Sequence, residues 1–157
     1  MKPNKKLVRR QLDSTLDEFK KLSSISTPHK GWIRAIRDAL GITGPQLARR
    51  MGLSKQRVSK LEQTEVNGGT TLKTMSQAAE ALNCKFVYSI VPHESLENTV
   101  RKQAKLLAEE RLKRAHQTMT LEGQELSKSE LQDALDDLVE DLISNSQSSL
   151  WDENYDV

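Results

Sequence analysis

The most constraining feature of the chain is a 25-residue run, GITGPQLARRMGLSKQRVSKLEQTE, which begins at Gly41. Thr43 stands where a helix N-cap is expected, and Pro45 falls in the first turn, where its missing N–H costs nothing. Gly52 permits a sharp turn, and Ser54 is placed to cap a following helix. The run therefore predicts two short helices joined by a tight turn.

The two faces of the second predicted helix differ in chemistry. Val58 and Leu61 fall on its inner face, and Ala48 in the first helix is small enough for a close approach. Lys and Gln side chains can hydrogen-bond base edges, and Arg and Lys reach phosphates. No acidic residue between Ala39 and Leu61 opposes such a contact. The candidate DNA-binding residues are Gln46, Ser54, Lys55, Gln56, Arg57, Ser59 and Lys60.

This pattern is that of a helix-turn-helix, whose second helix enters the major groove of DNA. Residues 31–82 resemble the Xre/Cro-type regulators, which implies a homodimer on a palindromic double-stranded operator. The alternative is a helical bundle with incidental basic residues. One departure affects the register on DNA: the family opens its second helix with a phosphate-binding Gln, but this chain has Gly44-Pro45 there. Gln46 is the candidate substitute.

The flanking segments predict further helices. Apolar residues at helical spacing favour amphipathic helices over residues 7–22 and 32–40, separated by a small, polar linker. Thr70 or Thr71 is placed to cap another helix, which Asn83 is suited to end. That helix carries apolar residues at helical spacing, namely Leu72, Met75, Ala79 and Leu82.

One segment has the period-2 pattern of a β-strand. KFVYSIV, residues 85–91, alternates Phe86, Tyr88 and Ile90 with Val87, Ser89 and Val91, and Pro92 ends it. Because a lone strand has open edges, we expect it to pair with its copy in a second subunit or with a strand of a partner. The expected fold is mainly α, a helix-turn-helix bundle with one β-strand (about 85–91) and a C-terminal helical region.

The C-terminal part predicts two helices and a tail. Residues 96–117 favour a helix with a charged surface, and Ser127 with Glu130 has capping-box spacing at the start of the last helix. The Ser-, Asn- and Asp-rich end is expected to be flexible. The expected division is residues 1–27 (helix and linker), 28–92 (DNA-binding domain with a dimerisation strand), 93–146 (partner-binding helices) and 147–157 (acidic tail).

Charge is distributed unevenly along the chain. Residues 1–70 hold 15 Lys and Arg against 6 Asp and Glu, whereas residues 71–157 hold 9 against 16. A basic half and an acidic half indicate two different partners, although a solvated surface is the simpler alternative.

Several classes of protein are disfavoured. The three histidines are scattered, the single Cys84 cannot form an internal disulfide, and no phosphate-binding loop or catalytic constellation is recognisable. We therefore expect no enzyme, cofactor or metal site. No apolar run is long enough for a signal peptide or a membrane span, so a cytoplasmic protein is expected.

A second motif lies near the end of the segment 96–117. Thr118, Glu122 and Gly123 fit the (S/T)xxxE(G/N) signature of antitoxins that inhibit Fic adenylyltransferases, and residues 105–145 resemble the small VbhA/FicA-type antitoxins. The resemblance implies that Glu122 pairs with an Arg of the Fic active site. Ser149 to Asn154 also satisfies the pattern, but this copy falls in the expected tail and is treated as a chance match.

The order of segments resembles the "mobile mystery protein A" family, which is encoded beside a Fic protein. LSKQRVSKLEQTE, TLKTMSQAAEALNCKFVYSIVP and the later LEG carry this resemblance. It implies an antitoxin that represses its own operon and holds a Fic-family toxin inactive. The alternatives are a stand-alone Xre-type repressor and a HigA-like antitoxin of an mRNA-cleaving toxin.

Overall fold

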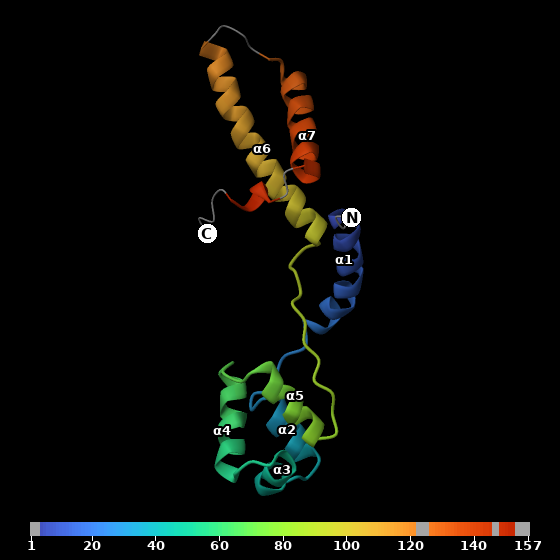
Figure 1. The fold of residues 1–157 in the computed structure, drawn as a ribbon, viewed down its shortest axis with the longest axis vertical. Coiled ribbons are helices and arrows are strands. Elements are labelled where there is room, and N and C mark those ends of the chain that lie inside the picture. The colour runs from blue at the N-terminus through green and yellow to red at the C-terminus, as the bar shows by residue number, and fades with distance from the viewer. Residues whose placement is uncertain (1–3, 122–125, 146–147, 153–157) are drawn as a thin grey trace. The chain divides into compact units, whose positions relative to one another are not determined.

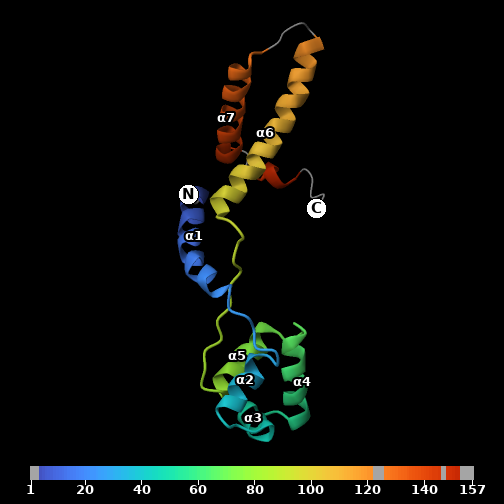
Figure 2. The same cartoon turned by 180° about the vertical axis from the view of Figure 1, so that it is seen from behind.

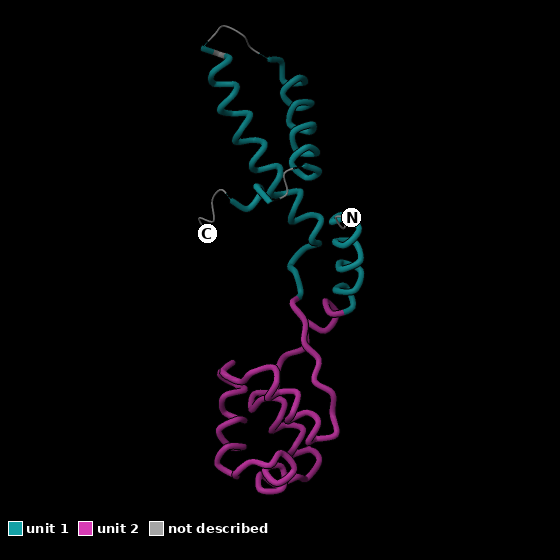
Figure 3. The backbone as a smooth tube through the Cα atoms, in the orientation of Figure 1, with its two compact units in different colours: residues 1–18, 91–157 teal, residues 19–90 magenta. Residues whose placement is uncertain are grey.

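The computed structural model describes residues 4–121, 126–145 and 148–152, and it divides into two compact units. Unit 1 comprises residues 1–18 and 91–157, and unit 2 comprises residues 19–90 (Figure 3). The first helix, α1 (Lys5–Leu22), begins in unit 1 and ends in unit 2. No helix in the described ranges is both long and apolar enough to cross a membrane.

Unit 2 is a bundle of short helices: α2 (Trp32–Ala39), α3 (Gly44–Met51), α4 (Lys55–Val66) and α5 (Leu72–Ala81) (Figure 1). Each contributes an apolar stripe to one core. The buried core residues are Ile33, Leu47, Ala48, Val58, Leu61, Ala78 and Leu82. The bundle predicted from the apolar spacing is confirmed, with boundaries within a residue or two of those expected.

The helix ends in unit 2 follow local rules. The Thr71 side chain accepts a hydrogen bond from the Thr74 N–H, so Thr71 rather than Thr70 caps α5. After α5, Asn83 adopts a left-handed backbone with φ of 56°. Asn tolerates that conformation better than most residues, which is why it ends the helix where the sequence predicts.

The predicted strand over residues 85–91 is wrong for the described chain, which has no β-strand there. Tyr88 and Ile90 are both exposed, Ile90 to 87%. The physical reason is that a strand is defined by its hydrogen-bonded partner, and no segment of the described residues pairs with this one.

In unit 1, α6 (Leu96–Leu121) and α7 (Lys128–Asn145) form an antiparallel hairpin (Figures 1 and 2). The helix expected over 96–117 thus extends to Leu121. Alanines on α6 allow α7 to approach closely, and aliphatic residues fill the contact. The buried core residues are Ala104, Leu107, Ala108, Val139, Leu142, Ile143 and Leu150.

The N-terminal part of α1 belongs to unit 1 because it caps α6. Asp13 Oδ1 accepts a hydrogen bond from the Leu96 N–H at 2.7 Å, and Oδ2 accepts one from the Glu97 N–H at 3.4 Å. Arg9 Nε also donates to Glu97 Oε2 at 2.7 Å. The sequence-based division set residues 1–27 apart, since contacts across more than 80 positions leave no local signal.

Part of the expected flexible tail is folded. Ser149–Trp151 form a short 3-10 helix, η1, and the Leu150 side chain is only 1% exposed within the unit 1 core. The Gln103 side chain on α6 donates to the Leu150 carbonyl oxygen at 2.8 Å. The structure therefore differs from the expected boundary at residue 147, because one buried leucine anchors a segment whose average composition is polar.

The capping box at the start of α7 is confirmed, and one of its hydrogen-bonding groups, the Glu130 carboxylate, makes it depend on pH. Hydrogen bonds from the Ser127 hydroxyl and, to a smaller extent, its backbone N–H lower the pKa of Glu130. The cap is therefore complete above the ordinary glutamate pKa of about 4.3 and is lost as pH falls through the lowered value.

We expect the Glu130 carboxyl signal in a ¹³C NMR titration to move below its usual range, and Ser127→Ala to return it toward that range. Equal midpoints in the two forms would show that Ser127 does not hold this carboxylate.

Candidate nucleic-acid interface

The turn between α3 and α4 has the geometry that the sequence predicts. Gly52 adopts a left-handed conformation with φ of 66° and ψ of 31°, which side chains other than Gly rarely allow. The Leu53 N–H then donates to the Ala48 carbonyl oxygen at 2.9 Å, closing the end of α3. The Ser54 side chain accepts from the Arg57 N–H at 3.2 Å and starts α4 immediately. Only three residues, 52–54, therefore join the two helices.

The inner face of α4 is fixed by burial. Val58 and Leu61 lie in the unit 2 core, and the buried Ala48 allows α3 to pack closely against α4. Burying side chains of this size contributes about 1.5–3 kcal/mol each, before the cost of ordering them. Because the inner face is held, the outer face is presented in one orientation.

The outer face of α4 is exposed and basic. Its exposed residues include the predicted Lys55, Gln56, Arg57, Ser59 and Lys60. In the described part of the chain, no carboxylate lies within ion-pair distance of Lys55, Arg57 or Lys60. Cations without an internal partner are available to phosphates and base edges, since no internal contact must break first.

Gln46 takes part in an N-cap that the sequence analysis overlooked. Its side-chain Oε1 accepts from the Thr43 N–H at 2.8 Å, and its own backbone N–H donates to Thr43 Oγ1 at 3.4 Å. The signal was present, because Thr-x-x-Gln is the spacing of a capping box. The side-chain Oε1 of Gln46 is thus occupied by a hydrogen bond within the protein. The side-chain Nε2 donates to no described residue and remains available to a phosphate.

Two arginines in the last turn of α3 line a cavity together with Gln46 from its first turn. A shallow cavity of about 410 Å³ is lined by Gly41, Ile42, Gln46, Arg49 and Arg50. Arg50 Nη1 donates to the Ala81 carbonyl oxygen at 3.1 Å and so ties α3 to α5. Arg49 has no such contact with the described residues, which makes it an additional candidate for a phosphate contact.

An ion pair behind α4 joins it to α2. Arg37 Nε lies 2.6 Å from Glu62 Oε1, and Arg37 Nη2 lies 3.3 Å from Glu62 Oε2. The two side chains are only 11% and 10% exposed. Arg37 Nη1 also donates to the Ile42 carbonyl oxygen at 2.9 Å. The hydrogen bond to Glu62 is the main cause that raises the pKa of Arg37, against the opposing effect of burial.

A second carboxylate of α4 caps α2. Glu65 accepts hydrogen bonds from the backbone N–H groups of Trp32 at 2.7 Å and Ile33 at 3.1 Å. Gly31 makes room for it, because a Cβ at that position would lie 2.7 Å from Glu65 Oε2 and the backbone φ is +80°. The orientation of α4, and with it of its exposed basic face, is therefore fixed by these polar contacts to α2 as well as by the apolar core.

The residues of the second predicted motif are described in part. Thr118 is exposed near the end of α6, and its Oγ1 donates to the Arg114 carbonyl oxygen at 3.2 Å. Glu122 and Gly123 lie outside the described residues. The candidate DNA-binding residues all belong to unit 2, whereas this motif belongs to unit 1.

Comparison with known proteins agrees with the geometry of unit 2. Residues 33–89 match the sequence model of the helix-turn-helix family, so the chain carries a helix-turn-helix domain of the Xre type across α2 to α5. No curated protein and no solved structure matches the chain. The match ends before Thr118, and the resemblance of the C-terminal part to Fic antitoxins stays a prediction.

Proposed function

We propose that this chain, a DNA-binding regulator through its helix-turn-helix domain, is the antitoxin of a Fic-type adenylyltransferase and represses its own operon. The DNA-binding part of the proposal is carried by one observation, the exposed basic face of α4 held by the buried Val58 and Leu61. The inhibitory part is assigned to Thr118, Glu122 and Gly123.

The recognition helix would lie in the major groove with its N-terminal residues toward the bases. Lys55 and Gln56 in the first turn of α4 are the proposed base contacts, and Gln46, Arg49, Arg57 and Lys60 are the proposed phosphate contacts. A homodimer would place two such helices on palindromic half-sites about 34–36 Å apart. Exposed apolar side chains at Val87, Tyr88 and Ile90 in unit 2 are available for the contact between subunits.

The inhibitory part is supported by how α6 ends. The helix is continuous to Leu121, Thr118 is exposed on its last turn, and Leu121 is 89% exposed. In a complex that extends this helix, a residue four positions after Thr118 would share its face.

The proposed chemistry is competition for one arginine. The Glu122 carboxylate would pair with an active-site Arg of the Fic enzyme that otherwise holds the γ-phosphate of ATP. A bidentate Arg–carboxylate pair in a desolvated cleft is strong enough to replace a phosphate contact. The exposed carboxylates of α7 would favour fast, salt-sensitive association with a basic surface on the enzyme; they are Asp133, Asp136, Asp137, Glu140 and Asp141.

The test is co-expression of the chain with the product of the adjacent gene, followed by an assay of adenylyl transfer. We expect the wild-type complex to be silent and the Glu122→Gly complex to assemble and be active, because one carboxylate is a small part of an interface. Retention of both complexes on the operator should be equal, since the two motifs lie in different units.

The matched control is Glu153→Gly, which removes the Glu of the second copy of the motif. We expect that complex to stay silent. Activity from both variants, or silence from both, would remove Glu122 as the inhibitory residue. Failure of any complex to form would leave the helix-turn-helix as a repressor whose C-terminal helices have another role.

A further inference from the structure

Unit 2 contains an apolar cavity of about 340 Å³ that is lined by none of the residues assigned to DNA binding or to Fic inhibition. It lies where α2, α5 and the segment that follows α5 meet. Its volume is within the range of small-molecule sites, about 300–1,000 Å³. An apolar cavity of about 150 Å³ is already enough to take up benzene. The cavity is therefore large enough for a small organic ligand.

The cavity extends from the surface of unit 2 to its core. Ile33 and Leu82 line it and are only 3% and 2% exposed, and they belong to the same core as Val58 and Leu61. Trp32 also lines the cavity but is 44% exposed, so it lies where the cavity opens to solvent. A ligand bound there would contact the core at one end and water at the other.

Two aromatic side chains line the cavity from different elements. Trp32 begins α2, and Phe86 belongs to the segment after α5. The Phe86 ring is itself held by stacking on Tyr88, with the ring centroids 5.9 Å apart and the planes inclined by 17°. Aromatic rings attract another ring more than its buried area alone accounts for. These walls therefore favour an aromatic ligand over an aliphatic one.

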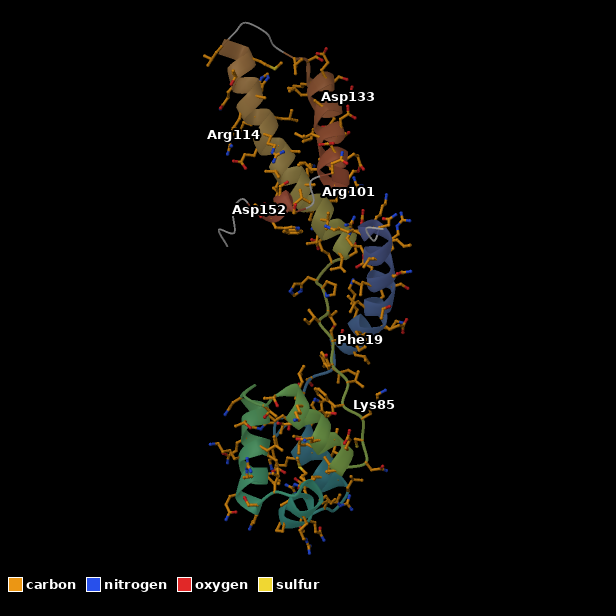
Figure 4. The ribbon with its side chains drawn as sticks, in the orientation of Figure 1. Phe19, Lys85, Arg101, Arg114, Asp133 and Asp152 are labelled. Atoms are coloured by element: carbon orange, nitrogen blue, oxygen red, sulfur yellow. The ribbon has the colours of Figure 1, made fainter. Side chains whose placement is uncertain are left out.

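Lys85 is the charged residue among those that line the cavity (it is labelled in Figure 4). In the described part of the chain, no carboxylate lies within ion-pair distance of its ammonium group. The Cys84 thiol also lines the cavity, but it already donates to the Leu82 carbonyl oxygen at 3.4 Å. The cavity thus places one cation without an internal partner beside an apolar volume. The complementary ligand carries one negative charge on an apolar body.

We propose that this cavity binds a small aromatic carboxylic acid, with its ring between Trp32 and Phe86 and its carboxylate beside Lys85. The segment 85–91 of a second copy of the chain is a poorer occupant, because it carries another lysine and no acidic residue. Entering the cavity, it would bring a like charge toward Lys85. Since the bound acid contacts core residues, its binding stabilises the folded state of unit 2.

The experiment is a fluorescence titration of the full-length chain in a Trp151→Phe background. The chain has two tryptophans, so Trp32 is then the only one, and its signal comes from the wall of the cavity. The probes are 3-phenylpropanoate, its neutral amide 3-phenylpropanamide, and hexanoate. The amide keeps the ring and removes the charge, whereas hexanoate keeps the charge and removes the ring.

We expect a saturable change of the Trp32 signal with 3-phenylpropanoate and weaker binding of hexanoate. The amide should bind about three- to fivefold more weakly, the usual effect of losing an exposed ion pair. Lys85→Ala should remove this preference for the acid. The control Lys73→Ala, at an exposed position of α5 that does not line the cavity, should keep it. Equal binding of acid and amide to the Trp151→Phe protein, or hexanoate binding as tightly as the aromatic acid, would overturn the proposal.

A second pair of variants locates the ligand. Ala79→Leu adds a larger apolar side chain at a half-buried position that lines the cavity, and Ala39→Leu makes the same change at an exposed position of α2 outside it. We expect binding about tenfold weaker in Ala79→Leu and unchanged in Ala39→Leu, with denaturation curves verifying that both are folded. Unchanged binding by a folded Ala79→Leu variant contradicts the proposed site.

The protein concentration distinguishes the small molecule from a second copy of the chain. We expect the affinity for 3-phenylpropanoate to be the same at low and high protein concentration. If a higher protein concentration abolishes binding of the acid, a second copy occupies the cavity and the proposal is wrong.

Discussion

Replacing Glu62 by Ala is expected to destabilise unit 2 by about 3–5 kcal/mol, the usual effect of removing one partner of a buried ion pair. Arg37 is only 11% exposed in the intact protein, and its Nε and Nη2 would lose the acceptors that lie at 2.6 and 3.3 Å. Because domains are stable by only about 5–15 kcal/mol, a large part of the stability of unit 2 would be lost.

The measurement is chemical denaturation of the full chain followed by tryptophan fluorescence. The chain has two tryptophans, Trp32 in unit 2 and Trp151 in unit 1, so a Trp151→Phe background reports on unit 2 alone. The matched control is Asp38→Ala. Asp38 also pairs with Arg37, at 2.8 Å, but its side chain is 53% exposed, and its loss should cost about 1 kcal/mol or less. Similar losses of unfolding free energy in the two variants would show that the Arg37–Glu62 pair contributes no more to stability than the exposed Arg37–Asp38 pair.

Lys55→Ala with Gln56→Ala is expected to weaken binding to the operator by roughly 10- to 100-fold, since a good base contact contributes about 1–3 kcal/mol of discrimination. Both side chains are exposed in the first turn of α4 and take no part in the core, so stability should change little. The measurement is fluorescence anisotropy with a labelled duplex from the region upstream of the gene, at several salt concentrations. A decrease of about 1 in the slope of log affinity against log salt would instead assign Lys55 to a phosphate contact.

The matched control is Lys85→Ala with Gln77→Ala, which removes the same two residue types from α5 and the segment after it. Figure 4 labels Lys85 on the side of unit 2 away from α4. We expect the control to bind the operator like wild type. Equal weakening in both double variants would indicate a general electrostatic attraction and would exclude α4 as the specific reading element.

The helix-turn-helix could be predicted because its signals are local. A cap acts within three residues and a left-handed turn at one, so Thr43, Gly52 and Ser54 determine helix ends without help from the rest of the chain. The helical period likewise assigns Val58 and Leu61 to the core and leaves Lys55 and Gln56 outside. The Thr43–Gln46 capping box was readable from the same kind of spacing and was missed.

The polar contacts between α4 and α2 are only weakly indicated by the sequence. Glu62 adjoins Leu61 and follows Val58 by four residues, so a charged side chain falls on an apolar face. Arg37 has the same relation to Ile33. Two opposite charges on inward faces favour a buried ion pair. The sequence does not show that these two residues meet, because their contact depends on the packing of α2 against α4. The Glu65 cap on α2 depends on the same packing.

By itself, the sequence determined the helices, the local caps at Thr43, Ser54, Thr71 and Ser127, and the outward basic face of α4, because each depends on neighbours within one or two turns. The tertiary structure alone decided that α1 caps α6 through Asp13, that Leu150 is buried, and that residues 85–91 have no paired strand in the described chain. These features depend on contacts between segments far apart in the chain or on a missing partner. Periodicity reports which face of a segment is apolar, but not what covers that face.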